Sequence, residues 1–303
     1  MIVFSESSTG YMTANERFTQ NIVDHNSNLL HRFITIKKLE GISEHTVSTY
    51  TKNVTLLSQA TGQAYETMTA DDIRTYMNKY QEERHISNGT LDHMRLTFNS
   101  FFKFLVEEDY MLRNPMVKVH PIHKDKVLKL PFSDEDLTKL QDFPLNKRDR
   151  AIVDLLYSSG CRVSELVKLN RQDINLKEKE GIVYGKGKKY RMIYFDAKTK
   201  LHLEYYLESR NDNEPPLFIT HNFPFSRLDR STVEKLCHDI GEAAGVDNVY
   251  PHRFRRTLAT NLLRKGMPIE QVQKILGHSN IQTTLIYAAV SQTDVKINHQ
   301  KYV

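Results

Sequence analysis

Cysteine is scarce in this chain. Among 303 residues only Cys161 and Cys237 are present, far apart in the sequence. This spacing argues against a disulfide framework and favours a reducing interior as the surroundings. We expect both side chains to behave as small buried apolar residues.

The sequence also lacks a long apolar segment. No stretch is long enough to cross a bilayer, and residues 1–20 lack a basic leader followed by an apolar run. We therefore expect a cytoplasmic protein with no membrane partner.

The excess of positive charge is small. Lys plus Arg number 42 and Asp plus Glu number 37, which gives a formal net charge of +5. This balance suits a polyanionic partner such as a nucleic acid, but many basic proteins bind none. Hydrophobic residues make up 39% of the chain, enough to bury cores in two domains of ordinary size.

The first third of the chain contains four helical patterns. Residues 1–17 are polar without a clear period and predict a loose arm, and the helical patterns occupy residues 18–116. The second pattern follows Ser43, and the third opens on Thr69 with Asp72 three residues later. The fourth has the strongest apolar stripe, formed by Leu91, Met94, Phe98, Phe101 and Leu105. These patterns predict a small all-α domain.

A basic segment, residues 117–131, follows this domain. Prolines near both ends and alternating basic residues predict an extended linker that is long enough to cross a duplex, and its basic residues suit contact with phosphates. His120 and His123 in this segment have no Cys, Asp or Glu partner at metal-binding spacing, so we expect no metal there.

Residues 132–287 combine helical patterns with one predicted strand pair. Ser133 has the spacing of a helix cap, and Ser159-Gly160 ends a helical pattern just before Arg162. That arginine is therefore expected at a corner between two helices. β-branched and aromatic residues flank the segment Gly-Lys-Gly-Lys-Lys at 185–189, which predicts a hairpin with a basic tip.

Side chains suited to chemistry gather between residues 250 and 287. His252 and Arg255 are three apart at the start of a helical pattern, so they project within about 60° of each other and can bind one ligand together. His278 lies in a break between two short helical patterns, and Tyr287 lies at the far end of the second. A phenol near cationic and proton-bearing groups is the arrangement expected of a nucleophile aimed at a phosphodiester.

Taken singly, these side chains have ordinary explanations. Arg162 and Lys186 suit solvated or ion-paired positions, and His278 suits a helix cap. Tyr287, in a chain with 15 tyrosines, suits a core position.

Taken together, five motifs occur in an order typical of one family. They are Gly160-Cys-Arg162-Val-Ser-Glu-Leu, Gly185-Lys186-Gly187, Pro251-His252-Arg-Phe-Arg255, Leu276-Gly277-His278-Ser and Tyr287. In these motifs the chain resembles the tyrosine recombinases, which include phage and transposon integrases and Xer-type proteins. The resemblance covers about residues 30–290, including the helical segment that ends at Asn114-Pro115.

The resemblance implies a cationic clamp on a phosphodiester. Arg162 and Arg255 would bind the phosphate oxygens in the planar geometry that suits them, and His278 would add a hydrogen bond to the same phosphate. Glu165 and Ser164 are expected to support the Arg162 corner.

The resemblance also implies how the strand is cut. Tyr287 would attack phosphorus and leave a 3′-phosphotyrosyl bond, while His252 would help to take or return its proton. Lys186 would protonate the departing 5′ oxygen. Because the ester energy is kept, neither ATP nor a metal nor another cofactor is expected.

Further basic residues are expected to contact DNA phosphates, with simple solvation as the alternative. Arg256 stands where the family commonly has a histidine and is given no catalytic role. The expected phosphate contacts are Lys188, Lys189, Arg191 and Arg253.

The fold and partners implied by the resemblance complete the prediction. A helical, SAM-like core-binding domain and an α-rich catalytic domain with a small antiparallel sheet would form a C-shaped clamp on double-stranded DNA. Protomers would pair on each site and assemble into a synaptic tetramer, with residues 288–303 docking on a neighbouring subunit. Accessory DNA-bending proteins are further candidate partners.

The expected function is site-specific recombination, either integration and excision or dimer resolution. The alternatives are a type IB topoisomerase, which relaxes DNA alone, and a DNA-binding protein without catalysis.

Overall fold

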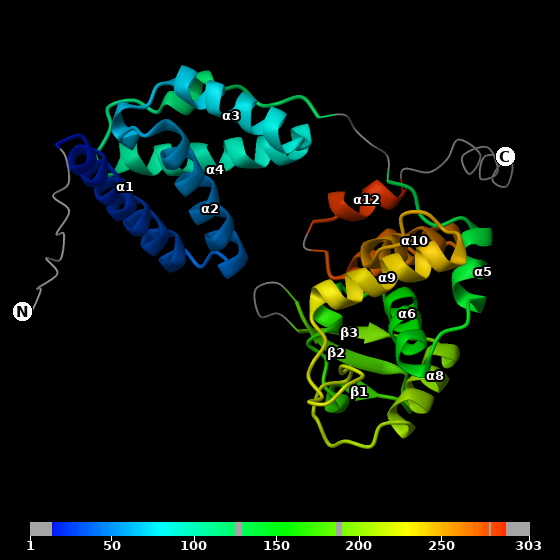
Figure 1. Cartoon of the computed structure of the whole chain (residues 1–303). Coiled ribbons are helices and arrows are strands. Elements are labelled where there is room, and N and C mark those ends of the chain that lie inside the picture. Colours follow the sequence, from blue (N-terminus) through cyan, green and yellow to red (C-terminus); the bar gives the residue numbers. More distant parts are fainter. Residues whose placement is uncertain (1–13, 125–128, 186–189, 279, 289–303) are drawn as a thin grey trace, which may run out of the picture. The chain divides into compact units, whose positions relative to one another are not determined.

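The computed structural model describes residues 14–124, 129–185, 190–278 and 280–288 (Figure 1). Lys186, Lys188 and Lys189 and the predicted tail beyond residue 288 lie outside these residues. The chain divides into two compact units, Met1–Val127 and Leu128–Val303, and each unit has a hydrophobic core of its own.

The first unit is entirely helical in its described part. The first helix begins at Ala14, inside the stretch that the sequence pattern predicts as a loose arm. The side chain of Ser43 accepts a hydrogen bond from a backbone N–H at the start of the second helix, and Thr69 and Asp72 form a reciprocal capping box at the start of the third. Both caps confirm the expectation from spacing. The elements are α1 (Ala14–Leu39), α2 (Glu44–Thr61), η1 (Tyr65–Thr67), α3 (Ala70–Arg84), α4 (Asn88–Glu107) and η2 (Pro115–Lys118).

Helix α4 supplies the centre of this core. Phe98, Phe101 and Leu105 are fully buried, as the apolar stripe predicts. The ring of Phe101 lies edge-on to Phe33 of α1 at 5.3 Å between centroids and to Tyr65 of η1 at 4.7 Å. Aromatic packing of this kind joins elements that are distant in the sequence.

The beginning of the predicted linker lies on this first unit. The buried carboxylate of Asp92 in α4 accepts a hydrogen bond from the backbone N–H of Ile122 at 3.2 Å. The same carboxylate forms ion pairs with Lys124 at 2.6 Å and Arg95 at 2.7 Å, and these contacts hold the pKa of the Asp92 carboxyl well below its usual range. Lys124 therefore faces a protein carboxylate in this structure.

The second unit has helices around a small sheet. Its helices are α5 (Asp134–Asp142), α6 (Lys147–Ser159), α7 (Val163–Leu166), η3 (Arg171–Asp173), α8 (Ala197–Glu208), α9 (Arg230–Ala244), α10 (Pro251–Arg264), α11 (Ile269–Leu276) and α12 (Gln282–Ala288). The strands are β1 (Ile174–Asn175), β2 (Glu180–Tyr184) and β3 (Tyr190–Tyr194), antiparallel in the order β1-β2-β3. The strands on both sides of the predicted tip confirm the expected hairpin.

The sheet places alternate residues on opposite faces. Val183 and Ile193 are buried in the core, whereas Tyr184, Tyr190 and Tyr194 are exposed on the other face. Arg191 pairs with Val183 across the two strands. Since residues two apart share a face of a strand, Arg191 lies on the same side as Ile193, toward the interior.

Helix α6 lies at the middle of the second unit and packs against α8 and α10 (Figure 1). Its apolar residues are almost completely buried, so the position of its last turn is fixed by the core.

The two cysteines, Cys161 shortly after α6 and Cys237 in α9, are buried as expected. Burial raises the pKa of the Cys161 thiol to about 11 and that of the Cys237 thiol to about 12.

The first residue after the predicted linker packs on α10. The backbone N–H of Phe132 donates to the hydroxyl of Thr257 at 2.9 Å, and the Phe132 ring lies 5.0 Å from that of Phe254. This contact orients the helix that begins with the Pro251-His252 motif.

None of the helices in the part of the chain that the structure describes is long and apolar enough to span a membrane.

Candidate active site

Arg162 stands at a sharp corner. Helix α6 ends at Ser159, the next residue Gly160 adopts a left-handed φ of +57°, and the chain then turns into the short helix α7. The backbone N–H of Arg162 donates to Glu165 Oε2 at 2.8 Å, and Arg162 Nη1 donates to Glu165 Oε1 at 2.7 Å. Arg162 Nη2 donates to the carbonyl of Gly277 at 3.2 Å. The side chain is thereby held at the surface with 36% of its area exposed.

Arg255 lies beneath this corner and is 1% exposed. Nη1 donates to the carbonyl of Gly160 at 2.6 Å and Nη2 donates to the carbonyl of Leu276, so the guanidinium joins the ends of α6 and α11. Its Nε is buried and has no hydrogen-bond partner within the described ranges. Burial, with the nearby charges of Arg162 and Arg191, lowers the pKa of Arg255 to about 10, so the group stays charged at neutral pH.

Tyr287 and His252 face each other. Tyr287 is carried by α12, is 8% exposed, and has its hydroxyl 3.5 Å from His252 Nε2. His252 is in the first turn of α10, which packs against α12. When His252 is neutral and carries its proton on Nδ1, the phenol can donate to Nε2.

His278 occupies the break between α11 and α12. Gly277 follows the last residue of α11 in the left-handed conformation, φ +64°, which is common for a glycine at a helix end. His278 Nδ1 lies 2.9 Å from the hydroxyl of the buried Thr284, and the imidazole ring lies 5.9 Å from the Tyr287 ring. Ser279 stands three residues before Gln282, the spacing of a capping box, but it lies outside the described residues. The side chain of Asn280 accepts a hydrogen bond from the backbone N–H of Gln282 at 2.9 Å.

Both imidazoles are neutral at pH 7. Partial burial and the charges of Arg255 and Arg256 lower the pKa of His252 to about 4. Burial and the charges of Arg255 and Arg162 lower the pKa of His278 to about 4 as well. Both shifts have the same two causes, which are desolvation by burial and the charges of a cluster of cations. Such a cluster favours an anionic ligand.

Glu165 holds the cluster together. The carboxylate is 2% exposed and accepts hydrogen bonds from Arg162 and, at 2.6 Å, from Arg191 Nη2. Burial by itself raises the pKa of Glu165, but the hydrogen bonds and charges of Arg191 and Arg162 outweigh it and lower the pKa. Two guanidinium groups therefore share one buried carboxylate. The sequence motif predicts that Glu165 supports Arg162, but it gives no sign of the contact with Arg191.

The structure places the remaining predicted residues as follows. Arg191 is engaged with Glu165 and the carbonyl of Ile275. Arg253 is also engaged within the protein, with its guanidinium 4.2 Å from the ring centroid of Phe132 and Nη2 donating to the carbonyl of Pro131 at 3.2 Å. Arg256 is buried beside Tyr250, whose hydroxyl lies 3.2 Å from its Nη1. Lys186, Lys188 and Lys189 lie outside the described residues.

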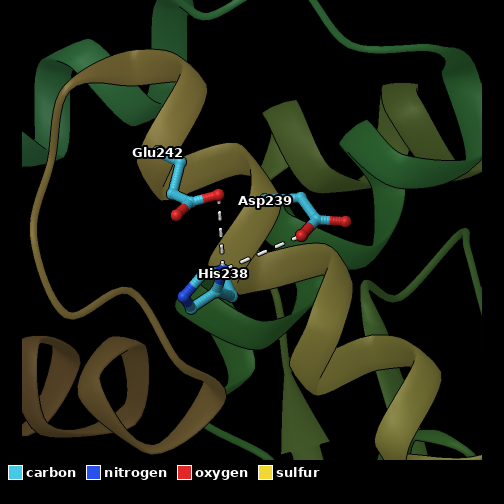
Figure 2. A group of neighbouring side chains, drawn as sticks. All are labelled: His238, Asp239 and Glu242. Atoms are coloured by element: carbon cyan, nitrogen blue, oxygen red, sulfur yellow. Dashed lines mark ion pairs between the residues drawn. The ribbon is translucent and has the colours of Figure 1, made fainter.

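A separate group of potential metal ligands lies on α9 (Figure 2). His238, Asp239 and Glu242 have ligand atoms within 4.8 Å of one another, and both carboxylates lie 3.7 Å from His238 Nδ1. All three residues are exposed and lie within about one turn of one helix. Bound metals are usually surrounded by side chains that orient the ligands, and exposed neighbours on one turn supply no such support. We interpret this group as an ion-paired helix surface.

Comparison with known proteins identifies relatives for both units. Residues 131–294 match the model of the phage integrase family, and residues 29–112 match that of the phage integrase N-terminal SAM-like domain. The tyrosine recombinase XerC of Staphylococcus aureus (strain JH9) is 33% identical over 276 residues, which cover 86% of this chain and 91% of that relative.

Solved structures share the architecture. The crystal structure of XerA recombinase matches with a TM-score of 0.54 and 28% identity, covering 91% of this chain and 98% of that chain. The XerH site-specific recombinase bound to a palindromic difH substrate matches with a TM-score of 0.71 and 18% identity, covering 98% of this chain and 90% of that chain. The expected fold class, mainly helical with a SAM-like domain and a small antiparallel sheet, is confirmed.

Proposed function

The chain belongs to the phage integrase family, and we propose on that basis that it is a site-specific recombinase that cuts and rejoins DNA strands through Tyr287. The observation that carries this proposal is the convergence of a phenol, an imidazole and two guanidinium groups from elements far apart in the sequence. The phenol lies 3.5 Å from His252 Nε2, and the guanidinium groups of Arg162 and Arg255 both bind carbonyls at the end of α11.

The two arginines suit a phosphodiester in its transition state. Attack on phosphorus spreads negative charge over the equatorial oxygens, so fixed cations that meet those oxygens lower the barrier. Arg162 is exposed enough to reach a ligand, and the buried Nε of Arg255 is a donor without a partner inside the described part of the protein. His278 is held in place by Thr284 and would donate to the same phosphate.

The neutral His252 suits the role of a base. In the proposed step the phenol proton passes toward His252 Nε2 as the Tyr287 oxygen bonds to phosphorus. The bond from phosphorus to the 5′ oxygen breaks, and Lys186, outside the described residues, would supply the proton for that oxygen. A 5′ hydroxyl of another strand then attacks the 3′-phosphotyrosyl ester and releases Tyr287. One phosphate ester replaces another, so the scheme balances without ATP or a metal.

Double-stranded DNA is the proposed partner. XerH, similar in fold to this chain, was solved bound to its DNA substrate in a post-cleavage complex. We extend this to protomers that pair on each DNA site and assemble into a tetramer for strand exchange. Phosphate contacts would make the affinity strongly dependent on salt concentration.

A nicked suicide substrate tests the nucleophile. We expect Tyr287→Phe to abolish the covalent protein–DNA adduct while duplex affinity stays within a few-fold, because the ring still fills the same buried position. Tyr194→Phe is a matched control, since Tyr194 is exposed on the outer face of β3, and it should retain the adduct. Equal adduct yields from the wild type and Tyr287→Phe would refute the assignment.

The DNA products of the reaction distinguish a recombinase from the alternative, a type IB topoisomerase. A recombinase should yield exchanged strands when two DNA copies are present. Relaxation of supercoiled DNA without any exchanged product would favour the topoisomerase.

A further inference from the structure

Arg191 occupies an internal position between two parts of the candidate site. It lies in β3 opposite Val183, and only 12% of its side chain is exposed. Nη2 donates to Glu165 Oε2 at 2.6 Å, and Nη1 donates to the backbone carbonyl of Ile275. The guanidinium thus connects the corner at α7 with the last turn of α11.

Each end of this connection holds a proposed catalytic group. Glu165 accepts hydrogen bonds from both the backbone and the side chain of Arg162, at 2.8 and 2.7 Å. Ile275 lies in the last turn of α11, just before Gly277. The carbonyl of Gly277 accepts a hydrogen bond from Arg162 Nη2 at 3.2 Å, and His278 directly follows Gly277 in the chain. Moving Arg191 would therefore change where Arg162 and His278 lie relative to each other.

The packing leaves Arg191 little freedom. A Cβ at Gly277 would come within 2.5 Å of Arg191 Cδ and within 3.0 Å of Nε, so the side chain lies directly against that glycine. Turning outward to a phosphate would break the ion pair with Glu165. That carboxylate is 2% exposed and would keep Arg162 as its only cationic partner among the described residues. Breaking a buried pair from one side is costly, which argues against Arg191 as a DNA contact.

We propose that Arg191 is a positioning residue for strand cleavage: it joins Glu165 to the Ile275 carbonyl and so sets the geometry of Arg162 and His278 around the phosphate. The role rests on the proposed function of the site. It replaces the phosphate contact that the basic sequence around Arg191 suggests.

The test separates the cleavage step from DNA binding. Arg191→Met keeps most of the length of the side chain but removes its charge and donors, and Arg191→Lys keeps the charge but cannot hold both partners. Two quantities are measured for each variant: the rate of adduct formation on a suicide substrate at saturating protein, and the affinity for duplex over a range of salt concentrations.

For Arg191→Met we expect adduct formation to slow by about 10-fold or more, by analogy with the loss of residues that orient metal ligands. Duplex affinity should stay within about three-fold of the wild type, and the slope of log affinity against log salt should not change. Arg191→Lys should fall between the wild type and Arg191→Met.

A matched control addresses stability. Arg171 is also a partly buried arginine of the second unit, paired with Asp212 at 3.0 Å, and Asp212 keeps Arg210 as a partner when Arg171 is removed. Arg171→Met should leave the rate of adduct formation at saturation unchanged. An equal slowing in this control would show that loss of stability explains the effect and would overturn the proposal.

A double variant tests the path through Glu165. If Arg191 acts through that carboxylate, Arg191→Met should slow cleavage less in a Glu165→Gln background than in the wild type. Fully additive effects would overturn the connection.

Two further outcomes are decisive. An unchanged cleavage rate in Arg191→Met, with a salt slope smaller by about one, would identify Arg191 as a phosphate contact instead. Absence of an adduct from the wild type on the same substrate would overturn the proposed function itself, and the role of Arg191 would fall with it.

Discussion

At the scale of single residues, the pKa values of the two histidines reflect their burial and the positive charge around them. The pKa values of His252 and His278 are lowered to about 4 by burial and by the arginines around them. An unfolded chain has ordinary histidines with a pKa near 6.5. Between about pH 4 and 6.5 the unfolded state therefore binds protons that the folded state does not, and stability falls as the pH is lowered through this window.

We predict that the melting temperature of the DNA-free protein falls between pH 7 and pH 5, and that the double variant His252→Gln/His278→Gln loses less over the same interval. Differential scanning calorimetry at the two pH values measures this. His238→Gln, at an exposed position on α9, is the control and should follow the wild type. A double variant with the same pH dependence as the wild type would contradict the lowered pKa values.

The inward-facing position of Arg191 is encoded in the strand pattern of the sequence, although the family motifs give no sign of it. In β3 the residues alternate between an outer face with Tyr190 and Tyr194 and an inner face with Ile193, and Arg191 has the inner parity. Strand alternation alone could have placed it inside. The lysines next to Arg191 in the sequence suggest a surface position instead. Local composition is misleading here, because it does not indicate on which face of a strand a residue lies.

At the scale of secondary-structure elements, the site depends on how α6 ends. Gly160 has a φ of +57°, and a Cβ there would come within 2.8 Å of Leu258 and 3.1 Å of Leu276. The carbonyl of the same residue accepts the hydrogen bond from Arg255. This glycine therefore allows the turn, the packing of α10 and the position of a proposed catalytic arginine.

Gly160→Ala should destabilise the second unit by about 1–2 kcal/mol for the left-handed backbone and by about 1–3 kcal/mol more for the overpacking. Gly245→Ala is a matched control, because Gly245 has a φ of +66° at the end of α9 and a methyl group there would meet nothing within 4 Å. Gly245→Ala should lose only the stability that the left-handed backbone conformation costs, without the overpacking. Denaturant unfolding of the two variants measures the difference, and equal losses would mean that the contacts at Gly160 relax freely.

The helix ends were predictable where a few neighbouring residues encode them. The caps at Ser43, Thr69 and Ser133 are all as expected, since each signal lies within one turn. The corner at Arg162 was predictable for the same reason. The contacts of Arg162 and Arg255 with the carbonyls of α11 were not, because they join distant segments, as in the hydrogen bond from Arg162 to Gly277, 115 residues away. Such contacts depend on the whole core.

At the scale of the whole molecule, the proposed nucleophile Tyr287 lies beside the histidine and arginine side chains of its own chain. Tyr287 contacts His252 of the same chain at 3.5 Å, and α12 packs on α10 and α11 of that chain. This arrangement favours cleavage in which one protomer supplies both the clamp and the phenol.

We therefore predict that mixing Tyr287→Phe with Arg162→Ala yields no adduct beyond the sum of the two variants alone. Each protomer would lack one part of the site, and neither could supply the missing part to the other. A mixture of each variant with wild type is the control for assembly and should form adduct. Clear restoration in the mixed variants would show that the phenol acts on a partner's phosphate.

The backbone oxygens around the two proposed clamp arginines have a consequence for the direction of the reaction. The carbonyls of Gly160, Leu276 and Gly277 fix the guanidinium groups that would meet the equatorial oxygens of a phosphate, and those oxygens are the same whether the ester is to tyrosine or to deoxyribose. A clamp of this kind accelerates opening and resealing alike and gives neither ester an advantage. Whether the strands end up recombined or restored would then be decided outside the candidate site, by the energies of the DNA arms and of the assembled protomers.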